Sequence, residues 1–285
     1  MSEREHIQIC WGYNVKFIKT RLDVLLAVAL VTFKEWGAYR SHSMVSIFVG
    51  PVFFVVQYFI WTAVFAAGGM PGMELEEVIR YFAATALIGY LVMDFADWNL
   101  SMLVQTGKFL TFSLRPMNHS FFALSQKVGH RILGFLVEFV PCWLIFTFVF
   151  GIDMRPACFG WVLVSVGLAF LMNFYVNYSI GLASFWIVQS GGIRSVYGLL
   201  GGIFSGALIP LVFFPQPLQI AQFFLPFQYT SFVPAMVFLG RFELGGMQMD
   251  IPVIVGIQAV AVIAVYVFCQ TLNSLALKKF TAVGA

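Results

Sequence analysis

Apolar runs separated by short polar segments occupy most of the chain, and their lengths predict membrane-spanning helices. A helix needs about 20 mainly apolar residues to cross the hydrocarbon core of a bilayer. Runs of this kind lie at 44–67, 78–103, 121–150, 157–187, 198–214 and 251–277. The pattern therefore predicts an all-α integral membrane fold with six transmembrane helices.

The segment over 11–42, ahead of the first run, has an amphipathic pattern instead. Two helical faces separate its residues: Lys16, Lys19, Asp23 and Lys34 on one, and Leu22, Leu25, Leu26, Ala29, Phe33 and Trp36 on the other. A helix with this pattern is typical of the membrane interface. A crossing through 22–33 would provide only about 18 Å of helix, which is too short to span. We therefore expect an N-terminal interfacial helix over 11–42.

The stretch from Gly206 to Met236 is uncharged and apolar, yet it holds five prolines, at positions 210, 215, 217, 226 and 234. Proline lacks a backbone donor and breaks a helix. Arg194 and Arg241 bracket 46 uncharged residues, about 69 Å if helical, of which one span uses roughly 30 Å. Non-helical backbone at membrane depth must be surrounded by protein or line a cavity. The stretch therefore predicts an external re-entrant helical hairpin over 215–240, and a membrane-surface loop is the alternative.

Composition and charge agree with a membrane protein and set its orientation. Hydrophobic residues make up 60% of the chain and charged residues 10%, with a mean hydropathy of +0.89, whereas a soluble domain carries roughly a quarter charged residues. Thirteen Lys and Arg residues fall on one set of loops, and only Arg80, Arg155 and Arg241 on the other. The positive-inside rule then predicts that both termini are cytoplasmic. Without repeats or linkers, residues 1–285 are expected to form a single transmembrane domain.

The sequence shows no pattern for a metal, a cofactor or a phosphate. The four cysteines have no paired spacing and the four histidines form no i, i+4 pair, so no disulfide framework or metal site is expected. Thr106-Gly107-Lys108 is not a phosphate-binding loop, because the earlier glycine is missing and Phe109 stands where Ser or Thr is needed. We expect no catalytic residue, no cofactor and no nucleic-acid partner, and we do not expect this chain to be an enzyme.

Three acidic residues lie inside predicted spans: Asp94 and Asp97 in the second and Glu138 in the third. Ionisable residues are costly in lipid and are functional hypotheses by default. Asp94 and Asp97 share a helix face and would attract a cationic substrate or relay protons. The alternative is structural: pairing with Arg131, Lys127 or Arg194 near the inner surface.

Three amides, Gln57, Asn173 and Asn177, also lie inside predicted spans. Such amides either line a substrate path or hydrogen-bond between helices, which stabilises helix packing by roughly 0.6 kcal/mol or somewhat more. Together with the three acidic residues they form our candidate substrate path.

Basic and aromatic residues alternate in the loop between the second and third runs, LVQTGKFLTFSLRPMNHSFFALSQKVGHR. A short helix of this kind at the cytoplasmic surface, within 104–120, would dock into a groove on a soluble partner. A loop that only sets membrane topology would carry the same basic residues. The residues alone favour neither interpretation.

Two motifs carry a family resemblance. TGKFLTFSLRPMN resembles the G-x-x-x-x-x-x-L-R-P loop of one branch of uncharacterised permeases. GALIPLVFFPQPLQIAQFFLPFQYTSFVPAM is similar to that branch's G-x-x-I-P-L-x-F-F-P … L-P-F … P signature. The order of elements also resembles the permease (transmembrane) subunit of ABC-type-2 exporters, and the similarity covers almost the whole chain.

The resemblance implies a multi-pass permease, surrounded by lipid in the bacterial cytoplasmic (inner) membrane, that exports a hydrophobic or amphiphilic substrate. It implies a second permease, identical or related, and two copies of a separate ABC ATPase, where ATP and magnesium would bind. It also implies that 107–119 transmit the ATPase stroke. The candidate coupling residues are Gly107, Lys108, Phe109, Arg115, Pro116 and Met117.

In such permeases the first, second and fifth spans face the partner permease and form the path, and the broken element after the fifth closes it outside. An apolar constriction closes a path by excluding water. The candidate residues of this external gate are Pro210, Phe213, Phe214, Pro215, Pro217, Phe223, Phe224, Pro226, Phe227 and Pro234.

Two other classes of function stay open from the sequence. A proton-coupled secondary transporter or channel would use Asp94, Asp97 and Glu138 as a relay, although such carriers favour inverted repeats with broken helices in both halves. A membrane-embedded enzyme would need His, Asp or Cys residues facing one cavity, and the sequence displays no such cluster.

Overall fold

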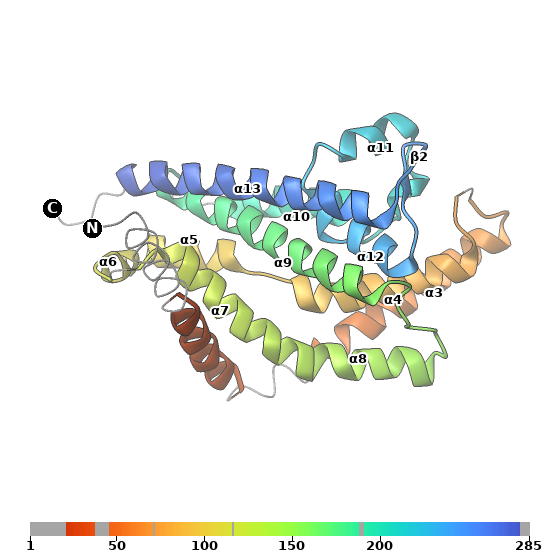
Figure 1. Cartoon of the computed structure of the whole chain (residues 1–285), viewed down its shortest axis with the longest axis horizontal. Helices are drawn as coiled ribbons and strands as arrows, with labels where there is room; N and C mark the ends of the chain where they lie inside the picture. Colours follow the sequence, from red (N-terminus) through yellow and green to blue (C-terminus); the bar gives the residue numbers. More distant parts are fainter. Residues whose placement is uncertain (1–20, 38–45, 71, 116, 188–190, 280–285) are drawn as a thin grey trace, which may run out of the picture.

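Helices run along the longest dimension of the protein, with a short β-hairpin at one end (Figure 1). This computed structural model describes residues 21–37, 46–70, 72–115, 117–187 and 191–279. We call the end that holds α6 and the last turn of α13 the α6 end, and the opposite end the hairpin end.

The α-helices are a helix over 21–37, α3 Val49–Ala66, α4 Leu75–Val92, α5 Ala96–Gln105, α6 Phe109–Ser113, α7 His119–Gly134, α8 Val140–Leu144, α9 Phe159–Leu182, α10 Gly191–Phe204, α11 Gln216–Gln222, α12 Phe232–Leu239 and α13 Ile251–Lys279. The strands are β1 Glu243–Leu244 and β2 Met247–Gln248, which pair antiparallel.

Five helical segments of the described chain are long and apolar enough to cross a membrane: Val49–Ala66, Leu75–Gln105, His119–Val149, Phe159–Phe185 and Ile251–Lys279. They correspond to five of the six predicted runs, and they support an all-α membrane protein. Local sequence explains where they begin. Glu74 and Glu77 form a capping box at the start of α4, and the Asn118 side chain accepts a hydrogen bond from the Ser120 amide at the start of α7.

The predicted span over 198–214 is wrong in its bounds. The described part of α10, Gly191–Phe204, ends well before the predicted end at 214, and its 14 residues give about 21 Å of helix, less than a crossing needs. The chain turns at Gly206, where a φ of 82° favours glycine. Pro210 then precedes a 3₁₀ turn, Leu211–Phe213. Hydropathy missed this turn because the residues that form it are apolar.

Two of the long spans are irregular inside. Between α4 and α5 residues 93–95 are not helical, so the second span is one run in sequence but two helices in space. The third span contains two π-helical turns, Phe135–Phe139 and Ile145–Val149, on either side of α8. Pro141 lies between them, and its missing N–H and its ring disturb the regular hydrogen-bond ladder.

The segment after α10 leaves the helix and returns to it. Phe232 donates a backbone hydrogen bond of 2.9 Å to the carbonyl oxygen of Ser205, so residues 206–231 begin and end at the same place. Within this excursion α11 lies beside the β-hairpin (Figure 1), and a 3₁₀ turn, Phe227–Thr230, leads back. The predicted element over 215–240 thus holds two helices, α11 and α12. The side of the membrane that it faces stays a prediction.

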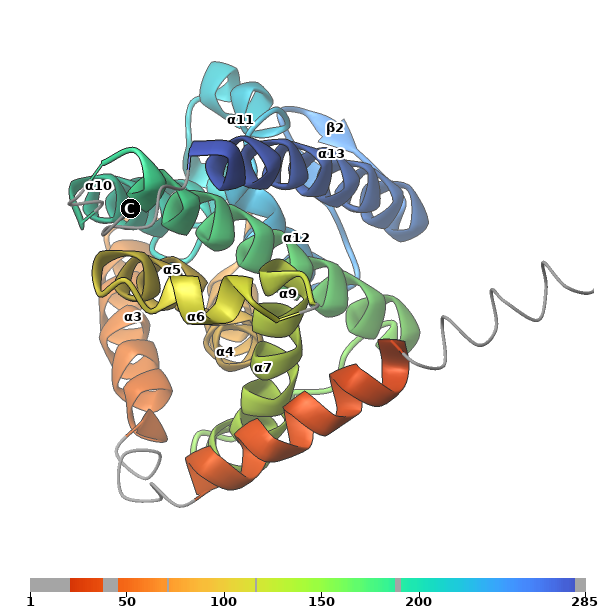
Figure 2. The same cartoon turned by 90° about the vertical axis from the view of Figure 1, so that its left-hand side faces the viewer.

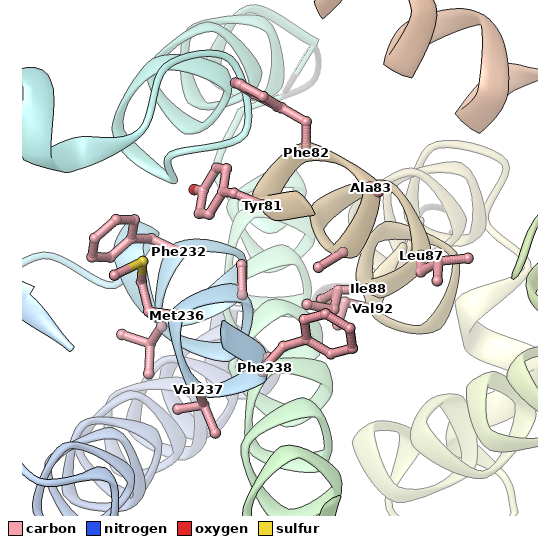
Figure 3. Close-up of a cluster of buried hydrophobic side chains, with 14 of the residues drawn as sticks. Tyr81, Phe82, Ala83, Leu87, Ile88, Val92, Phe232, Met236, Val237 and Phe238 are labelled. Atoms are coloured by element: carbon pink, nitrogen blue, oxygen red, sulfur yellow. The ribbon is translucent and has the colours of Figure 1, made fainter. Parts of the chain in front are cut away.

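The core of the molecule surrounds α12. Every residue from Phe232 to Phe238 is buried, and α12 packs against α4, α9 and α13. Figure 3 shows Tyr81 of α4 beside Phe232 and, further along, Ile88 and Val92 beside Phe238. Helix α12 is therefore a fixed part of the bundle, whereas most of α11 is exposed.

The N-terminal helix over 21–37 lies across α7 at an angle to the long helices (Figure 2). The predicted residues 11–20 and 38–42 lie outside the described part of the chain. Contact with α7 is close at Gly129, where a β-carbon would stand 2.2 Å from the carbonyl oxygen of Ala29. The rings of Trp36 and His130 stack with their centroids 4.2 Å apart. Only glycine at position 129 allows the two backbones to approach this closely.

Candidate functional site

Helices α3, α5 and α10 lie on one side of the molecule (Figure 2). The residues of this side and its neighbours line a row of four cavities. We name them from the α6 end. The α5 cavity (≈ 500 Å³) lies beside Trp98 and Ser101, and the polar cavity (≈ 340 Å³) beside Asp94 and Asn177. The apolar cavity (≈ 400 Å³) lies beside Val49 and Phe53, and the Trp61 cavity (≈ 560 Å³) beside Trp61 and Phe213.

Shared lining residues connect the first three cavities. Asp97 and Arg194 line both the α5 cavity and the polar cavity. Met93, Asn173 and Thr230 line both the polar cavity and the apolar cavity. The break between α4 and α5 therefore lies at the middle of the row, where the non-helical turn opens space beside α10.

The Gln57 side chain makes two hydrogen bonds beside the Trp61 cavity. Its amide nitrogen donates to the carbonyl oxygen of Leu208 at 3.3 Å, and its carbonyl oxygen accepts a 3.1 Å hydrogen bond from the Trp61 indole. Gln57 is buried and lines the Trp61 cavity. This amide therefore connects α3 to the turn that follows α10.

Asp94 and Asp97 are each paired with a base, as the structural alternative predicted. Lys127 Nζ lies 2.7 Å from Asp94 Oδ1, and Arg194 Nε lies 2.8 Å from Asp97 Oδ2. Asp94 Oδ1 also accepts the backbone N–H groups of Phe95 and Ala96. Both carboxylates are buried, and a buried charge is stable only when a partner compensates its lost hydration. The two pairs hold the non-helical turn of the second span against α7 and α10.

Glu138 is separate from the two aspartates. It lies in the π-helical turn Phe135–Phe139 and accepts a hydrogen bond from the Ser46 hydroxyl. It lines none of the four cavities described above. The structure therefore brings Asp94 and Asp97 to one cavity but places Glu138 at the contact between the third span and the residues before α3.

The two predicted asparagines both line the polar cavity. Asn173 donates a 2.8 Å hydrogen bond to the carbonyl oxygen of Val92, which is the last residue of α4 and lies where the helix is interrupted. Because the helix is interrupted there, the Val92 carbonyl group would have no donor within the helix, and Asn173 supplies one. Asn177 lies one turn further along α9, and its side chain is buried.

The predicted coupling residues surround α6, which lies at the α6 end. Gly107 has a φ of 71°, which favours glycine, and Lys108 is exposed. Phe109 is buried and packs edge-on against Phe185 at 5.1 Å. Arg115 is exposed, with its guanidinium 5.4 Å from the centre of the Phe112 ring. Met117 is half-buried, and Pro116 lies outside the described residues.

Helix α6 is therefore anchored on one face and exposed on the other. Its buried face is Phe109 and Phe112. Its other face exposes Leu110 and, just after the helix, Leu114, which is 81% exposed. An apolar ridge beside Arg115 has the chemistry of a docking surface for a soluble partner.

The prolines of the predicted gate lie where the backbone needs no N–H donor. Pro215 and Pro217 flank the first residue of α11, and Pro234 lies in the first turn of α12. The first N–H groups of a helix have no partner inside it. Pro210 and Pro226 stand immediately before the two 3₁₀ turns. The five prolines thus start elements and do not interrupt them.

The gate phenylalanines are divided among separate places, which differs from the single plug that we predicted. The ring centroids of Phe213 and Trp61 lie 4.9 Å apart, and those of Phe223 and Phe242 lie 6.3 Å apart. Phe224 is 88% exposed.

Two of these rings do converge. Phe214 and Phe227 each lie 6.3 Å from Phe204, at the end of α10, and Phe227 also lies 5.4 Å from Tyr197. We call Tyr197, Phe204, Phe214 and Phe227 the aromatic cluster. It brings the returning segment back onto α10.

Sequence reasoning missed Gln258, which connects three elements. This fully buried amide in α13 accepts a 2.8 Å hydrogen bond from the Ser165 hydroxyl and donates to the carbonyl oxygens of Ser165 and Tyr229. It thereby binds α9 and the 3₁₀ turn before α12. The available signal was an uncharged polar side chain in an otherwise apolar run of helix length.

Comparison with known proteins identifies a family over most of the chain. Residues 52–284 match the family model described as ABC-2 family transporter protein. No curated protein and no solved structure matches.

Proposed function

Because the chain belongs to the ABC-2 family of transporter proteins, we propose that it is the permease subunit of an ATP-binding-cassette exporter. It forms, with a second permease, a path through the bacterial inner membrane for a hydrophobic or amphiphilic substrate. A separate ATPase binds ATP and magnesium and drives export. The chain itself holds no catalytic residue.

The observation that carries this proposal is the row of cavities along α3, α5 and α10. These elements belong to the first, second and fifth runs, and the row extends from α5 to α11. The faces beside it are apolar and uncovered in the single chain: no residue of α10 is buried, and Val52, Val56 and Phe59 of α3 are exposed. An open row of cavities becomes a closed path only when a second permease covers it.

The two ends of the row of cavities differ, and this difference supports a cytoplasmic α6 end and an external hairpin end. At the α6 end, Leu110, Leu114 and Arg115 form the surface on which we place the ATPase, and charge complementarity there would select the partner. Towards the hairpin end, Phe213 and Phe214 line the Trp61 cavity, and Tyr197 and Phe227 of the aromatic cluster line the polar cavity. We place the external gate at these rings, around Phe204 of α10. A second copy would add its own aromatic residues to this gate.

A proton-coupled carrier is the less favoured alternative. Such a carrier would need Asp94, Asp97 and Glu138 to exchange protons in sequence. The pairs with Lys127 and Arg194 instead give the two aspartates a structural task, and Glu138 is bonded to Ser46 elsewhere. These contacts favour export driven by a partner ATPase.

Cysteine cross-linking in native membranes tests the proposed pairing of permeases. In a variant without the four native cysteines, Val56→Cys and Leu199→Cys would each be treated with a short bifunctional maleimide. We expect cross-linked permease pairs, because both residues are exposed beside the cavities. Val260→Cys, equally exposed on α13, is the matched control and should stay monomeric.

The same membranes test the ATPase. A tag on this chain should co-purify an ABC ATPase whose activity is coupled to substrate. Finding monomers alone at Val56 and Leu199, together with no ATPase, would refute the proposal.

A further inference from the structure

Two buried carboxylate oxygens at the polar cavity have no hydrogen-bond donor. Asp94 Oδ2 and Asp97 Oδ1 are both shielded from solvent and lack a partner, although the other oxygen of each group bonds to Lys127 or Arg194. Leaving a buried acceptor unmatched is unfavourable, most of all when it carries charge. The polar cavity beside them therefore has an unmet demand for donors.

The chemistry of this demand favours a protonated amine. An ammonium group carries three N–H donors and a positive charge, so it matches carboxylate oxygens in both respects. A quaternary ammonium has the charge but no donor, and an alcohol has a donor but no charge. An anion would meet two carboxylates, and its natural partner Arg194 is already bonded to Asp97.

The next cavity in the row matches the rest of such a molecule. The apolar cavity joins the polar cavity at Met93 and Thr230, and apolar side chains such as Val49, Phe53 and Ala86 line it. A ligand bound across the two cavities would place a polar group near Asp97 and an apolar chain between α3 and α4. Few polar groups in a mainly apolar pocket are typical of small-molecule sites.

We propose that the polar cavity binds the protonated amino group of an amphiphilic amine, whose apolar part occupies the apolar cavity. This rests on the proposed function, because the two cavities belong to the path assigned above. Asp97 is the main contact and Asp94 the second. Binding draws on the two unmatched oxygens, while Asp94 keeps its contact with Lys127 and Asp97 its contact with Arg194.

Equilibrium binding to the transporter, purified through a tag on this chain and placed in nanodiscs without nucleotide, tests the proposal. The probes are radiolabelled decylamine, decyltrimethylammonium and decanol, each corrected with empty nanodiscs. We expect saturable binding of decylamine at least about tenfold tighter than that of the other two. One lost charge-assisted hydrogen bond weakens binding by about tenfold or more, so Asp97→Asn should reduce decylamine affinity by that factor.

Three further variants make the result decisive. Asp97→Asn combined with Arg194→Gln removes both charges and guards against misfolding from an unpaired arginine. Asn177→Leu keeps the ion pair but fills the polar cavity, so it should also weaken decylamine binding. Asp250→Asn, an exposed position outside the row, is the control and should bind as the natural chain does.

The outcomes separate the site from the proposed function. Equal binding of all three probes, or decylamine affinity unchanged in both Asp97 variants, would overturn the amine site even if an ATPase co-purifies and permeases cross-link. Selective decylamine binding that depends on Asp97 supports the amine site even if no ATPase partner is found. The missing ATPase would in that case contradict only the proposal that the chain is an exporter subunit.

Discussion

The Tyr81 hydroxyl of α4 donates a 2.7 Å hydrogen bond to the carbonyl oxygen of Gly206, at the turn where α10 ends. Tyr81 is completely buried, and a β-carbon at Gly206 would stand 2.6 Å from its hydroxyl oxygen. Only glycine therefore fits at position 206 beside this tyrosine. This contact fixes the point at which residues 206–231 leave α10 and to which Phe232 brings the chain back.

Removing the Tyr81 hydroxyl should destabilise the protein without changing its shape. Tyr81→Phe leaves the Gly206 carbonyl without its partner, and an unmatched buried acceptor of this kind costs about 1–3 kcal/mol. We expect a lower melting temperature of the detergent-solubilised protein. Tyr266→Phe, at a tyrosine of α13 that is 42% exposed, is the matched control and should melt as the natural chain does. Equal melting of all three would show that the bond contributes nothing.

The N-terminal helix should come loose when Gly129 gains a side chain. Gly129→Ala places a methyl group 2.2 Å from the Ala29 carbonyl oxygen, and overpacking of this kind costs about 1–3 kcal/mol. We expect faster amide hydrogen exchange over 21–37. Gly167→Ala, where nothing lies within 4 Å of the added carbon, should leave exchange unchanged. Protection that is equal in both variants would contradict the close contact.

Reversing the charge of Arg115 should uncouple transport from ATP hydrolysis. Arg115 is exposed beside Leu114 and contacts Phe112 and Phe122, so Arg115→Glu changes the docking surface and keeps the buried face of α6. We expect normal membrane insertion but a loss of substrate-stimulated ATPase activity of about tenfold or more, as for a broken interface charge pair. Arg155→Glu, in the segment before α9, is the control. Natural activity in Arg115→Glu would mean that the loop only sets topology.

Opening the aromatic cluster should make the resting transporter leak. Phe214→Ser combined with Phe227→Ser removes two of the rings around Phe204, and a wetted constriction no longer excludes small solutes. We expect efflux of a small dye from proteoliposomes without ATP. Phe224→Ser changes a ring that is 88% exposed and should stay tight. A tight double variant would place the gate elsewhere.

Reagent access should show how the excursion between α10 and α12 sits in the membrane. Leu218 is exposed on α11, whereas Gln222 is 1% exposed. A cysteine at Leu218 should react quickly with an impermeant maleimide added from outside, and one at Gln222 should react slowly at rest and faster during turnover. Labelling of both positions only from the cytoplasmic side would overturn the predicted orientation and the gate together.

Much of the fold follows from the sequence alone, because membrane solubility is a local property. Five of the six predicted runs are long helices of the structure, since only a helix satisfies the backbone of a long segment in lipid. The prolines at 215, 217 and 234 mark helix starts for an equally local reason. The family resemblance rested on two sequence motifs, at 107–119 and 206–236. Both motifs lie within the residues that match the family model.

Contacts between distant residues were decided by the tertiary structure. The sequence offered Arg131, Lys127 and Arg194 as possible partners of Asp94 and Asp97. The packing of α7 and α10 beside the second span decided that Lys127 pairs with Asp94 and Arg194 with Asp97. Likewise, hydropathy did not show that α10 would end at Phe204 and that the chain would turn at Gly206, because a glycine turn among apolar residues has the same hydropathy as a continuing helix. The backbone conformation there is fixed by Tyr81 and Phe232, which lie 125 and 26 residues away in sequence.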